Sequence, residues 1–252
     1  MRFTVLGSGN GVPSPTRGCP GHLLRAAGET VLVDPGPGAL AASARQGAGP
    51  GDITAVLISH LHLDHHLDLA ALLFALRAPR FRGRPPLRVR GPEGLLRVLG
   101  LWREAYGRWV DPAGYELDAA EVDAGPLRVG GLLVEAVPVP HGDLPALGWR
   151  LREREDGPVL AFSGDTGEGL GAVACGRGAD LFALECTLPE GEEPRKHLTA
   201  SAAGRVAAAA GCRRLVLVHL PEELEGAAVE AAVRGSWAGP LALASDGWSA
   251  DI

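Results

Sequence analysis

The chain has 252 residues, of which 46% are hydrophobic and 21% charged, proportions that are typical of a packed globular protein. We expect a single domain over residues 1–252, because no linker in the sequence is long enough to separate two domains. The formal net charge of −6 argues against a surface built to bind a long polyanion, since nucleic-acid binding usually needs a basic face.

The sequence does not predict a membrane protein. No apolar run approaches the roughly eighteen residues of a membrane span, and the start MRFTVLGSGNG predicts a strand and a Gly-rich turn rather than a signal peptide. We therefore expect a cytoplasmic protein. The cysteines are widely spaced and are expected to be buried, reduced thiols: Cys19, Cys175, Cys186 and Cys212.

Strands alternate with helices along the first half of the chain. Short apolar runs between Gly/Pro turns predict strands at 2–7, 22–26, 30–34 and 53–59, and helical spacing predicts helices over 67–78 and 92–107. Between these two helices, residues 77–90 contain six arginines and three prolines. This stretch is expected to be a solvated connection, with an arginine rim for an anionic substrate as the alternative.

The second half repeats this order of elements. We expect strands at 132–139, 147–153, 158–164, 213–220 and 241–245, and helices over 200–211 and 221–235. Two halves of similar make-up predict an α/β fold with a two-layered core and helices outside.

Residues 59–69 read SHLHLDHHLDL and contain half of the eight histidines in the chain. The preceding run is a predicted buried strand, so His60 and His62 lie at its carboxyl end, where α/β sheets present their binding loops. A helix is expected to begin near Asp64. Residues i and i+2 of an extended segment project to one side, so His60 and His62 can bind one ion, and Asp64 and His65 a second.

Three more candidate ligands follow other predicted strands. His141 comes after the strand at 132–139, Asp165 after the strand at 158–164, and His219 near the end of the strand at 213–220. All three are expected at the sheet edge that also carries His60. Two ions about 3.5–4 Å apart need such additional ligands, one of them a bridging oxygen.

The motifs H-L-H-L-D-H, S-G-D-T and V-H-L, together with His141, resemble those of the metallo-β-lactamase-fold hydrolases. The resemblance covers nearly the whole chain and implies an αββα sandwich of two mixed β-sheets flanked by helices. It also implies that V-L-V-D-P-G-P-G holds a structural aspartate, Asp34, which braces the ligand loops. In this family, the first metal would be held by His60, His62 and His141, the second by Asp64, His65 and His219, and Asp165 would bridge the two.

Two divalent ions that share a water lower the pKa of that water from 15.7 toward about 7, which suits hydrolysis at neutral pH through a bridging hydroxide. Zinc is the expected metal, because imidazole and carboxylate ligands suit it, although the same set accepts manganese or iron. The iron-containing redox branch of the fold is expected to have a glutamate between the first two histidines and a further acid in place of the next histidine. Here Leu61 and Leu63 fill the variable positions of the motif and His65 is a histidine, so the redox branch is disfavoured.

P-H-G-D-L-P-A-L-G-W-R-L followed by F-S-G-D-T is similar to the ribonuclease Z and small phosphodiesterase branch. L-E-C-T at 184–187 and H-L-T at 197–199 resemble its glutamate and histidine motifs. That resemblance implies that His197 is an acid or a phosphate ligand and that Glu185 orients it, so the candidate catalytic residues are Asp64, His197 and Glu185. Lys196 is a weaker candidate for binding an anion.

Only 24 positions separate His141 from Asp165, which leaves room for two strands and a turn but not for a tRNA-gripping arm. A small anionic substrate, such as a diester or cyclic phosphate, is therefore expected, and tRNA is disfavoured.

Three functions remain open: a phosphodiesterase, a hydrolase of a lactone, thioester or lactam, and a non-catalytic metal-binding accessory protein. A homodimer is the default expectation for the assembly. His66 and Asp68 are expected on the helix, with support of the ligands as the alternative, and His22 is expected to be an ordinary strand residue.

Overall fold

The computed structural model describes residues 1–224 and 226–252, and within them it contains two mixed β-sheets of seven strands each. The strands of the first sheet are β1 (Arg2–Gly7), β2 (Gly21–Ala26), β3 (Glu29–Val33), β4 (Ala55–Leu57), β5 (Leu87–Gly91), β6 (Leu117–Glu121) and β14 (Ser249–Asp251). The strands of the second are β7 (Gly125–Val129), β8 (Leu132–Pro138), β9 (Leu147–Arg152), β10 (Leu160–Phe162), β11 (Leu181–Glu185), β12 (Leu215–Val218) and β13 (Leu241–Leu243).

The two sheets share one topology. The first has the order β14-β1-β2-β3-β4-β5-β6, with antiparallel pairs as far as β3 and parallel pairs from β3 to β6. The second has the order β13-β12-β11-β10-β9-β8-β7, with antiparallel pairs from β7 to β10 and parallel pairs from β10 to β13. The similar make-up predicted for the two halves therefore corresponds to two sheets with the same order of antiparallel and parallel strand pairs.

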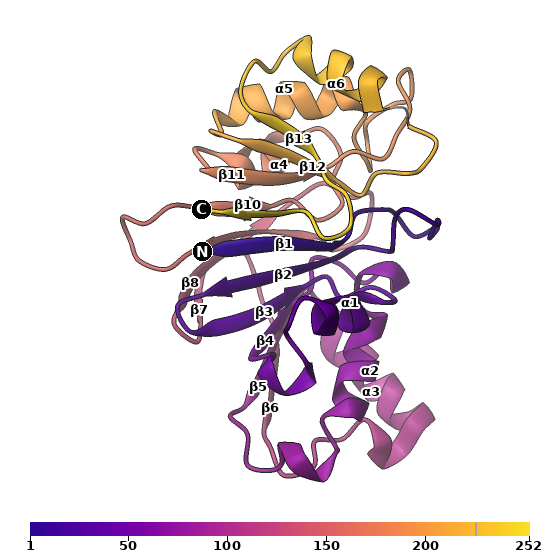
Figure 1. Cartoon of the computed structure of the whole chain (residues 1–252), viewed down its shortest axis with the longest axis vertical. Helices are drawn as coiled ribbons and strands as arrows, with labels where there is room; N and C mark the ends of the chain where they lie inside the picture. Colours follow the sequence, from indigo (N-terminus) through magenta and orange to yellow (C-terminus); the bar gives the residue numbers. More distant parts are fainter. Residues whose placement is uncertain (225) are drawn as a thin grey trace.

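Helices cover the outer face of each sheet (Figure 1). The first sheet packs against α1 (Ala39–Arg45), α2 (Leu67–Ala75) and α3 (Leu95–Tyr106), and the second against α4 (Leu170–Gly176), α5 (Ala200–Ala210) and α6 (Gly226–Arg234). Short 3-10 helices occupy η1 (Pro50–Asp52), η2 (Leu63–His65), η3 (Pro79–Phe81) and η4 (Gly107–Trp109). The expected αββα sandwich is confirmed.

The central core lies between the two sheets, where Phe3, Trp149 and Phe162 are almost completely buried. The alternation of buried and partly exposed residues along β8 matches a strand with one face in this core. Outside it, α5 buries seven of its eleven residues against the second sheet. Thr199 caps that helix by accepting a hydrogen bond from Ala202 N at 3.2 Å.

Two local predictions were wrong. The helix after the histidine cluster begins at Leu67 rather than near Asp64, because residues 63–65 form the 3-10 turn η2 and His66 leaves the helical conformation at φ −147°. Residues 77–90 are not one solvated connection, because they contain η3 and most of β5. The end of this arginine-rich stretch is thus part of the first sheet.

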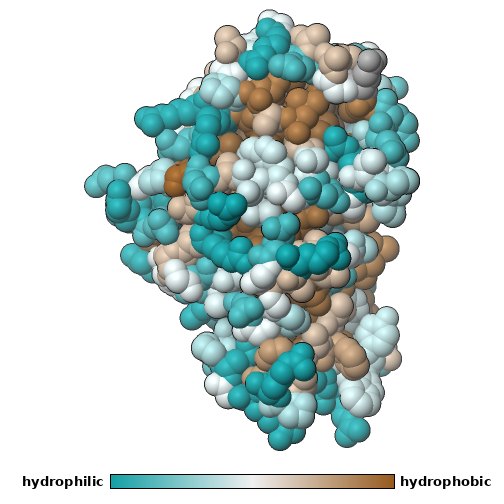
Figure 2. Space-filling view, viewed as in Figure 1, coloured by the Kyte–Doolittle hydropathy of each residue, from teal (hydrophilic) through white to brown (hydrophobic). Residues whose placement is uncertain are grey.

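The four cysteines are buried and unpaired, as expected. Among the described residues, no helix is both long enough and apolar enough to cross a membrane. Hydrophilic residues are interspersed with hydrophobic ones across the face that Figure 2 shows. The termini lie side by side, with the Met1 amino group 3.1 Å from the carbonyl oxygen of Ile252 (Figure 1).

Candidate metal centre

The first group of candidate ligands lies at the carboxyl ends of β4, β8 and β10. His60 and His62 follow β4, and His60 Nε2 lies 2.9 Å from His62 Nδ1. His141, which follows β8, places Nε2 3.3 Å from the same His62 nitrogen. Asp165 follows β10 and places Oδ2 3.6 Å from His60 Nε2. Four side chains from three strands therefore direct one atom each toward a common point.

The second group shares Asp165 with the first. Asp64 and His65 on η2 meet His219 from the end of β12, with the two Nε2 atoms of His65 and His219 3.3 Å apart. Asp64 Oδ2 lies 3.5 Å from His65 Nε2 and 3.6 Å from His219 Nε2. Asp165 Oδ1 lies 3.4 Å from each of those nitrogens. The carboxylate of Asp165 thus faces one group with each oxygen.

These distances fit a cation at the centre of each group. Two nitrogen ligands of a tetrahedral zinc ion, each about 2.0–2.1 Å from the metal, lie about 3.3–3.4 Å apart. The pairs His65–His219 and His62–His141 both match this edge at 3.3 Å, whereas His60 and His62 are closer. Asp165 Oδ1 is buried and accepts no hydrogen bond among the described residues. Histidine and aspartate clusters of this kind suit a divalent metal.

Most of the histidines in the two groups also form a hydrogen bond on the side of the ring that faces away from the centre. In each case Nδ1 donates a hydrogen bond outward, so that Nε2 is directed into the centre and is the nitrogen that can bind a metal when the imidazole is neutral. The pairs are His60 with Ser59 Oγ at 3.0 Å, His65 with Asp34 Oδ2 at 2.9 Å, His141 with Lys196 O at 2.8 Å, and His219 with Thr187 Oγ1 at 2.7 Å.

Asp34 braces two ligand positions at once, as the resemblance implied. Its carboxylate accepts hydrogen bonds from Ser59 N at 2.6 Å and Ser59 Oγ at 2.5 Å, as well as from His65. Gly36, two residues after Asp34, lies against the backbone of the loop that carries Asp64. A Cβ at that position would lie 1.8 Å from the carbonyl oxygen of Asp64, so only glycine allows this approach.

The charges of the centre favour cations. Burial opposes protonation of His65, but the carboxylates of Asp165 and Asp34 outweigh it and hold the His65 pKa well above its ordinary value. Burial alone would raise the pKa of Asp165, yet the neighbouring His219 and His65 hold it well below the usual range. Burial lowers the pKa of His60, so its imidazole is neutral at pH 7 and has the form that binds metals.

His197 and Glu185 form a separate pair beside the two groups. His197 Nδ1 lies 2.9 Å from Glu185 Oε1 and 3.8 Å from Asp165 Oδ2. Glu185, at the end of β11, is buried and also accepts hydrogen bonds from the backbone N–H groups of Thr166 at 2.9 Å and Leu198 at 3.2 Å. Burial opposes protonation of His197, but the bond to Glu185 outweighs it and raises the His197 pKa.

The remaining candidates have supporting positions. His66 Nδ1 donates to the carbonyl oxygen of His62 at 2.7 Å, and its ring stacks on Trp102 at 5.6 Å. Asp68 accepts a hydrogen bond from Leu40 N at 2.8 Å and so joins α2 to α1. His22 is a buried residue of β2, as expected.

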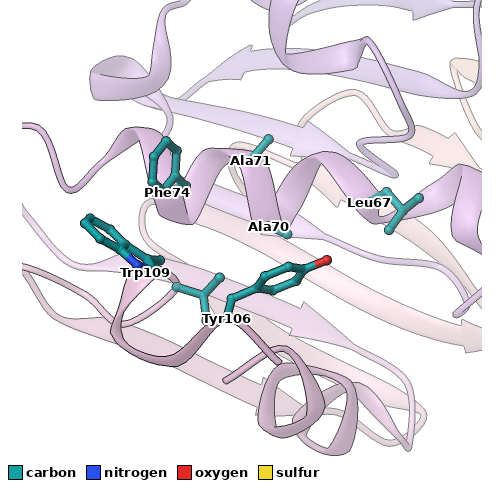
Figure 3. Close-up of a pocket in the computed structure, with 7 residues that line it drawn as sticks. Leu67, Ala70, Ala71, Phe74, Tyr106 and Trp109 are labelled. Atoms are coloured by element: carbon teal, nitrogen blue, oxygen red, sulfur yellow. The ribbon is translucent and has the colours of Figure 1, made fainter. Parts of the chain in front are cut away.

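A groove that is separate from these side chains lies between α2 and the region of η4 (Figure 3). It has a volume of about 600 Å³ and an apolar lining that includes Phe74, Tyr106 and Trp109, with none of the candidate ligands.

Most of the arginines in residues 77–90 form hydrogen bonds or ion pairs within the chain. These contacts join Arg77 to Asp111 O, Arg84 to Ile53 O, Arg88 to Glu29 and Arg90 to Asp118.

A family model described as the beta-lactamase superfamily domain matches residues 29–220. The chain belongs to this superfamily. This metallo-β-lactamase-fold protein is 34% identical to the uncharacterized protein ML1173 of Mycobacterium leprae over 257 residues, which cover 100% of the chain and 89% of that protein. It is 33% identical to a ribonuclease Z of Mycobacterium marinum over 196 residues, or 71% of the chain and 68% of the relative.

Solved structures agree with this assignment. The metallo-β-lactamase-fold protein YhfI of Bacillus subtilis superposes with a TM-score of 0.85 at 20% identity, covering 99% of this chain and 98% of its own. Human tRNase Z, short form, superposes with a TM-score of 0.78 at 26% identity, covering 100% and 99%. A diphosphatase of the PhnP family has a TM-score of 0.77 at 21% identity, covering 100% and 97%. The predicted family and its ribonuclease Z-like branch are confirmed.

Proposed function

We propose that this metallo-β-lactamase-fold hydrolase is a binuclear phosphodiesterase that acts on a small phosphodiester or cyclic phosphate. The observation that carries the proposal is the pair of His197 and Glu185, held at 2.9 Å beside the shared carboxylate of Asp165. A protonated imidazole at this position can bind a phosphoryl oxygen or donate a proton to the leaving oxygen. Either function would assist the hydrolysis of a phosphodiester next to the metals.

The ligand assignment follows the two groups of side chains. His60, His62 and His141 would hold one ion, Asp64, His65 and His219 the other, and Asp165 would bridge them. Zinc suits these nitrogen and carboxylate donors, and manganese or iron fits the same set. Two such ions, when bound, would activate a water molecule and polarise the phosphoryl group.

The side chains of the chain then have distinct roles. Glu185 accepts a hydrogen bond from the Nδ1–H of His197, so that the other ring nitrogen is the one that meets the substrate. Asp64 would hold metal and, through its carboxylate, could also orient the attacking water. The backbone hydrogen bonds to Glu185 keep its charge next to His197, which favours the protonated, anion-binding form of the imidazole.

A small substrate is favoured over tRNA by the length of the connection between the ligands. β9 and β10 both lie between His141 and Asp165, and residues 153–159 join these two strands. The connection is too short for an extended RNA-gripping arm. The net charge of −6 is also unsuited to a long polyanion.

The test is hydrolysis of bis(p-nitrophenyl) phosphate by protein loaded separately with zinc and with manganese. Turnover that needs metal and disappears in Asp165→Ala supports the proposal and identifies the working metal. A lactone and a thioester, assayed in parallel, represent the carboxyl-bond alternative. Turnover of those substrates alone, with two metals bound, would refute the phosphodiesterase. His197→Ala should keep its metals and lose activity toward a cyclic phosphodiester.

A further inference from the structure

Thr187 lies two residues after Glu185, beyond the end of β11. Its hydroxyl contacts both Glu185 and His219. Thr187 Oγ1 lies 2.9 Å from Glu185 Oε2 and 2.7 Å from His219 Nδ1. It also lies 3.1 Å from the carbonyl oxygen of His219. The hydroxyl is therefore placed between the acid–base pair and a candidate ligand of the second metal.

The hydrogen atoms in this contact can be assigned. A threonine hydroxyl has one proton to donate, and both Glu185 Oε2 and the carbonyl oxygen of His219 can only accept. The hydroxyl proton therefore goes to one of these oxygens. The 2.7 Å contact with His219 is then favourable only if Nδ1–H donates to Thr187 Oγ1. In the neutral imidazole Nε2 is then the unprotonated nitrogen, which is the tautomer that binds metal through Nε2.

The backbone of His219 is held in a strained conformation. It has φ +59°, in the left-handed region that residues other than glycine rarely adopt. Leu220 N donates to Ser8 O at 2.9 Å and holds the main chain there. Among the described residues, Thr187 is the hydrogen-bond partner of His219 Nδ1. One hydroxyl therefore supplies the hydrogen-bond partner of the outward-facing nitrogen of this imidazole.

We infer that Thr187 is a positioning residue that sets the tautomer and orientation of His219 and joins it to the His197–Glu185 pair. The inference rests on the binuclear centre proposed above and extends it by one residue. The connected path runs from His197 through Glu185 and Thr187 to His219. Without the hydroxyl, His219 can protonate Nε2 instead, and its Nδ1 loses its partner.

The test compares Thr187→Val with Thr187→Ser. Valine keeps the shape of the side chain and removes the hydroxyl, whereas serine keeps the hydroxyl and removes a methyl group. Loss of a hydrogen-bond partner behind a metal-binding histidine typically weakens metal affinity by about 10–100-fold. We expect a loss of this size for one of two zinc ions in Thr187→Val, and affinity close to wild type in Thr187→Ser.

Zinc affinity is measured by competition with a chromophoric chelator, without any substrate, and thermal unfolding of the metal-free proteins checks that each variant folds. His197→Ala should keep both zinc affinities, since it leaves Thr187 and His219 in contact. Two zinc ions bound to Thr187→Val with wild-type affinity would overturn the inference and leave the proposed function intact. Equal weakening in Thr187→Val and Thr187→Ser would also overturn it, because packing would then be the cause. Wild-type protein that binds fewer than two zinc ions would overturn the binuclear centre itself.

Discussion

His22 gives the stability of this protein a pH dependence whose size can be worked out from its surroundings. The imidazole lies in the central core. The centroid of its ring is 5.5 Å from the ring centroid of Phe3 and 4.6 Å from the ring centroid of Phe162. Its Nδ1 has no hydrogen-bond partner among the described residues. Burial, assisted by the nearby His65 and His219, lowers the pKa of His22 from 6.5 to about 3. The folded protein therefore holds His22 in its neutral form.

Below pH 6.5 the unfolded chain binds a proton at His22 that the folded chain does not bind until about pH 3. Stability must therefore fall as the pH falls through this window, by about 1.4 kcal/mol per pH unit. Between pH 6.5 and pH 5 the loss from His22 alone is about 2 kcal/mol. In His22→Leu, which has no titrating group at this position, that loss should disappear.

The measurement is urea unfolding of metal-free wild type and His22→Leu at pH 7 and at pH 5. The difference between the two proteins isolates the contribution of the His22 side chain. Wild type should lose about 2 kcal/mol more than the variant between the two pH values. Equal losses would show that His22 is protonated in the folded protein, and the reasoning from burial would be refuted.

Three further predictions concern the metal centre. As a general acid, His197 should contribute about 10²–10⁴-fold to hydrolysis of a diester with an alkyl leaving group and far less with p-nitrophenolate, which leaves unprotonated. Equal loss of rate for the two substrates in His197→Ala would instead assign it to phosphate binding. Gly36→Ala should displace the loop of Asp64, weaken zinc binding in a chelator assay and cost about 1–3 kcal/mol in urea unfolding, whereas Gly100→Ala, with nothing near its Cβ, should not. Zinc at about 100 times its dissociation constant should stabilise wild type by about 2.7 kcal/mol for each ion bound and raise its melting temperature, an effect reduced in Asp165→Ala.

The sequence was sufficient to predict where the candidate ligands lie because strand ends are easy to locate. The apolar runs before His60, His141, Asp165 and His219 are long enough to be strands, and parallel strands bring their carboxyl ends to one edge. The structure brings all of these side chains together. Their metal-binding roles remain a prediction until metals are measured.

The weaker elements could not be predicted, for reasons that the structure makes clear. β6 reads LDAAE, is only partly buried and lies at the edge of its sheet, so it lacks a strong apolar pattern. β5 alternates arginines with buried Leu87 and Val89 directly after two prolines, which made it look like a connection. α1 and α4 have only seven residues each and give too short a periodicity to recognise.

The hydroxyl partners of the histidines were also beyond prediction. An isolated serine or threonine carries no local pattern that distinguishes a supporting hydrogen bond from an exposed side chain. Ser59 is adjacent to His60 and could have been suspected, but Thr187 is 32 residues from His219. Only the parallel pairing of β11 with β12 brings those two residues together. The hydrogen bond from His141 to the backbone carbonyl of Lys196 is even harder to predict, because every residue has such a carbonyl.

The centre belongs to both sheets, and this explains why its geometry depends on the central core. β4 of the first sheet leads to His60, His62, Asp64 and His65, whereas the second sheet supplies the other candidates from β8, β10, β11 and β12. Neither sheet carries a complete set for either metal. The distances between the two sets are therefore determined by the packing of buried side chains between the sheets. Core substitutions far from the ligands should consequently affect metal binding as well as stability, since a close-packed interior transmits small displacements to the sheet edge.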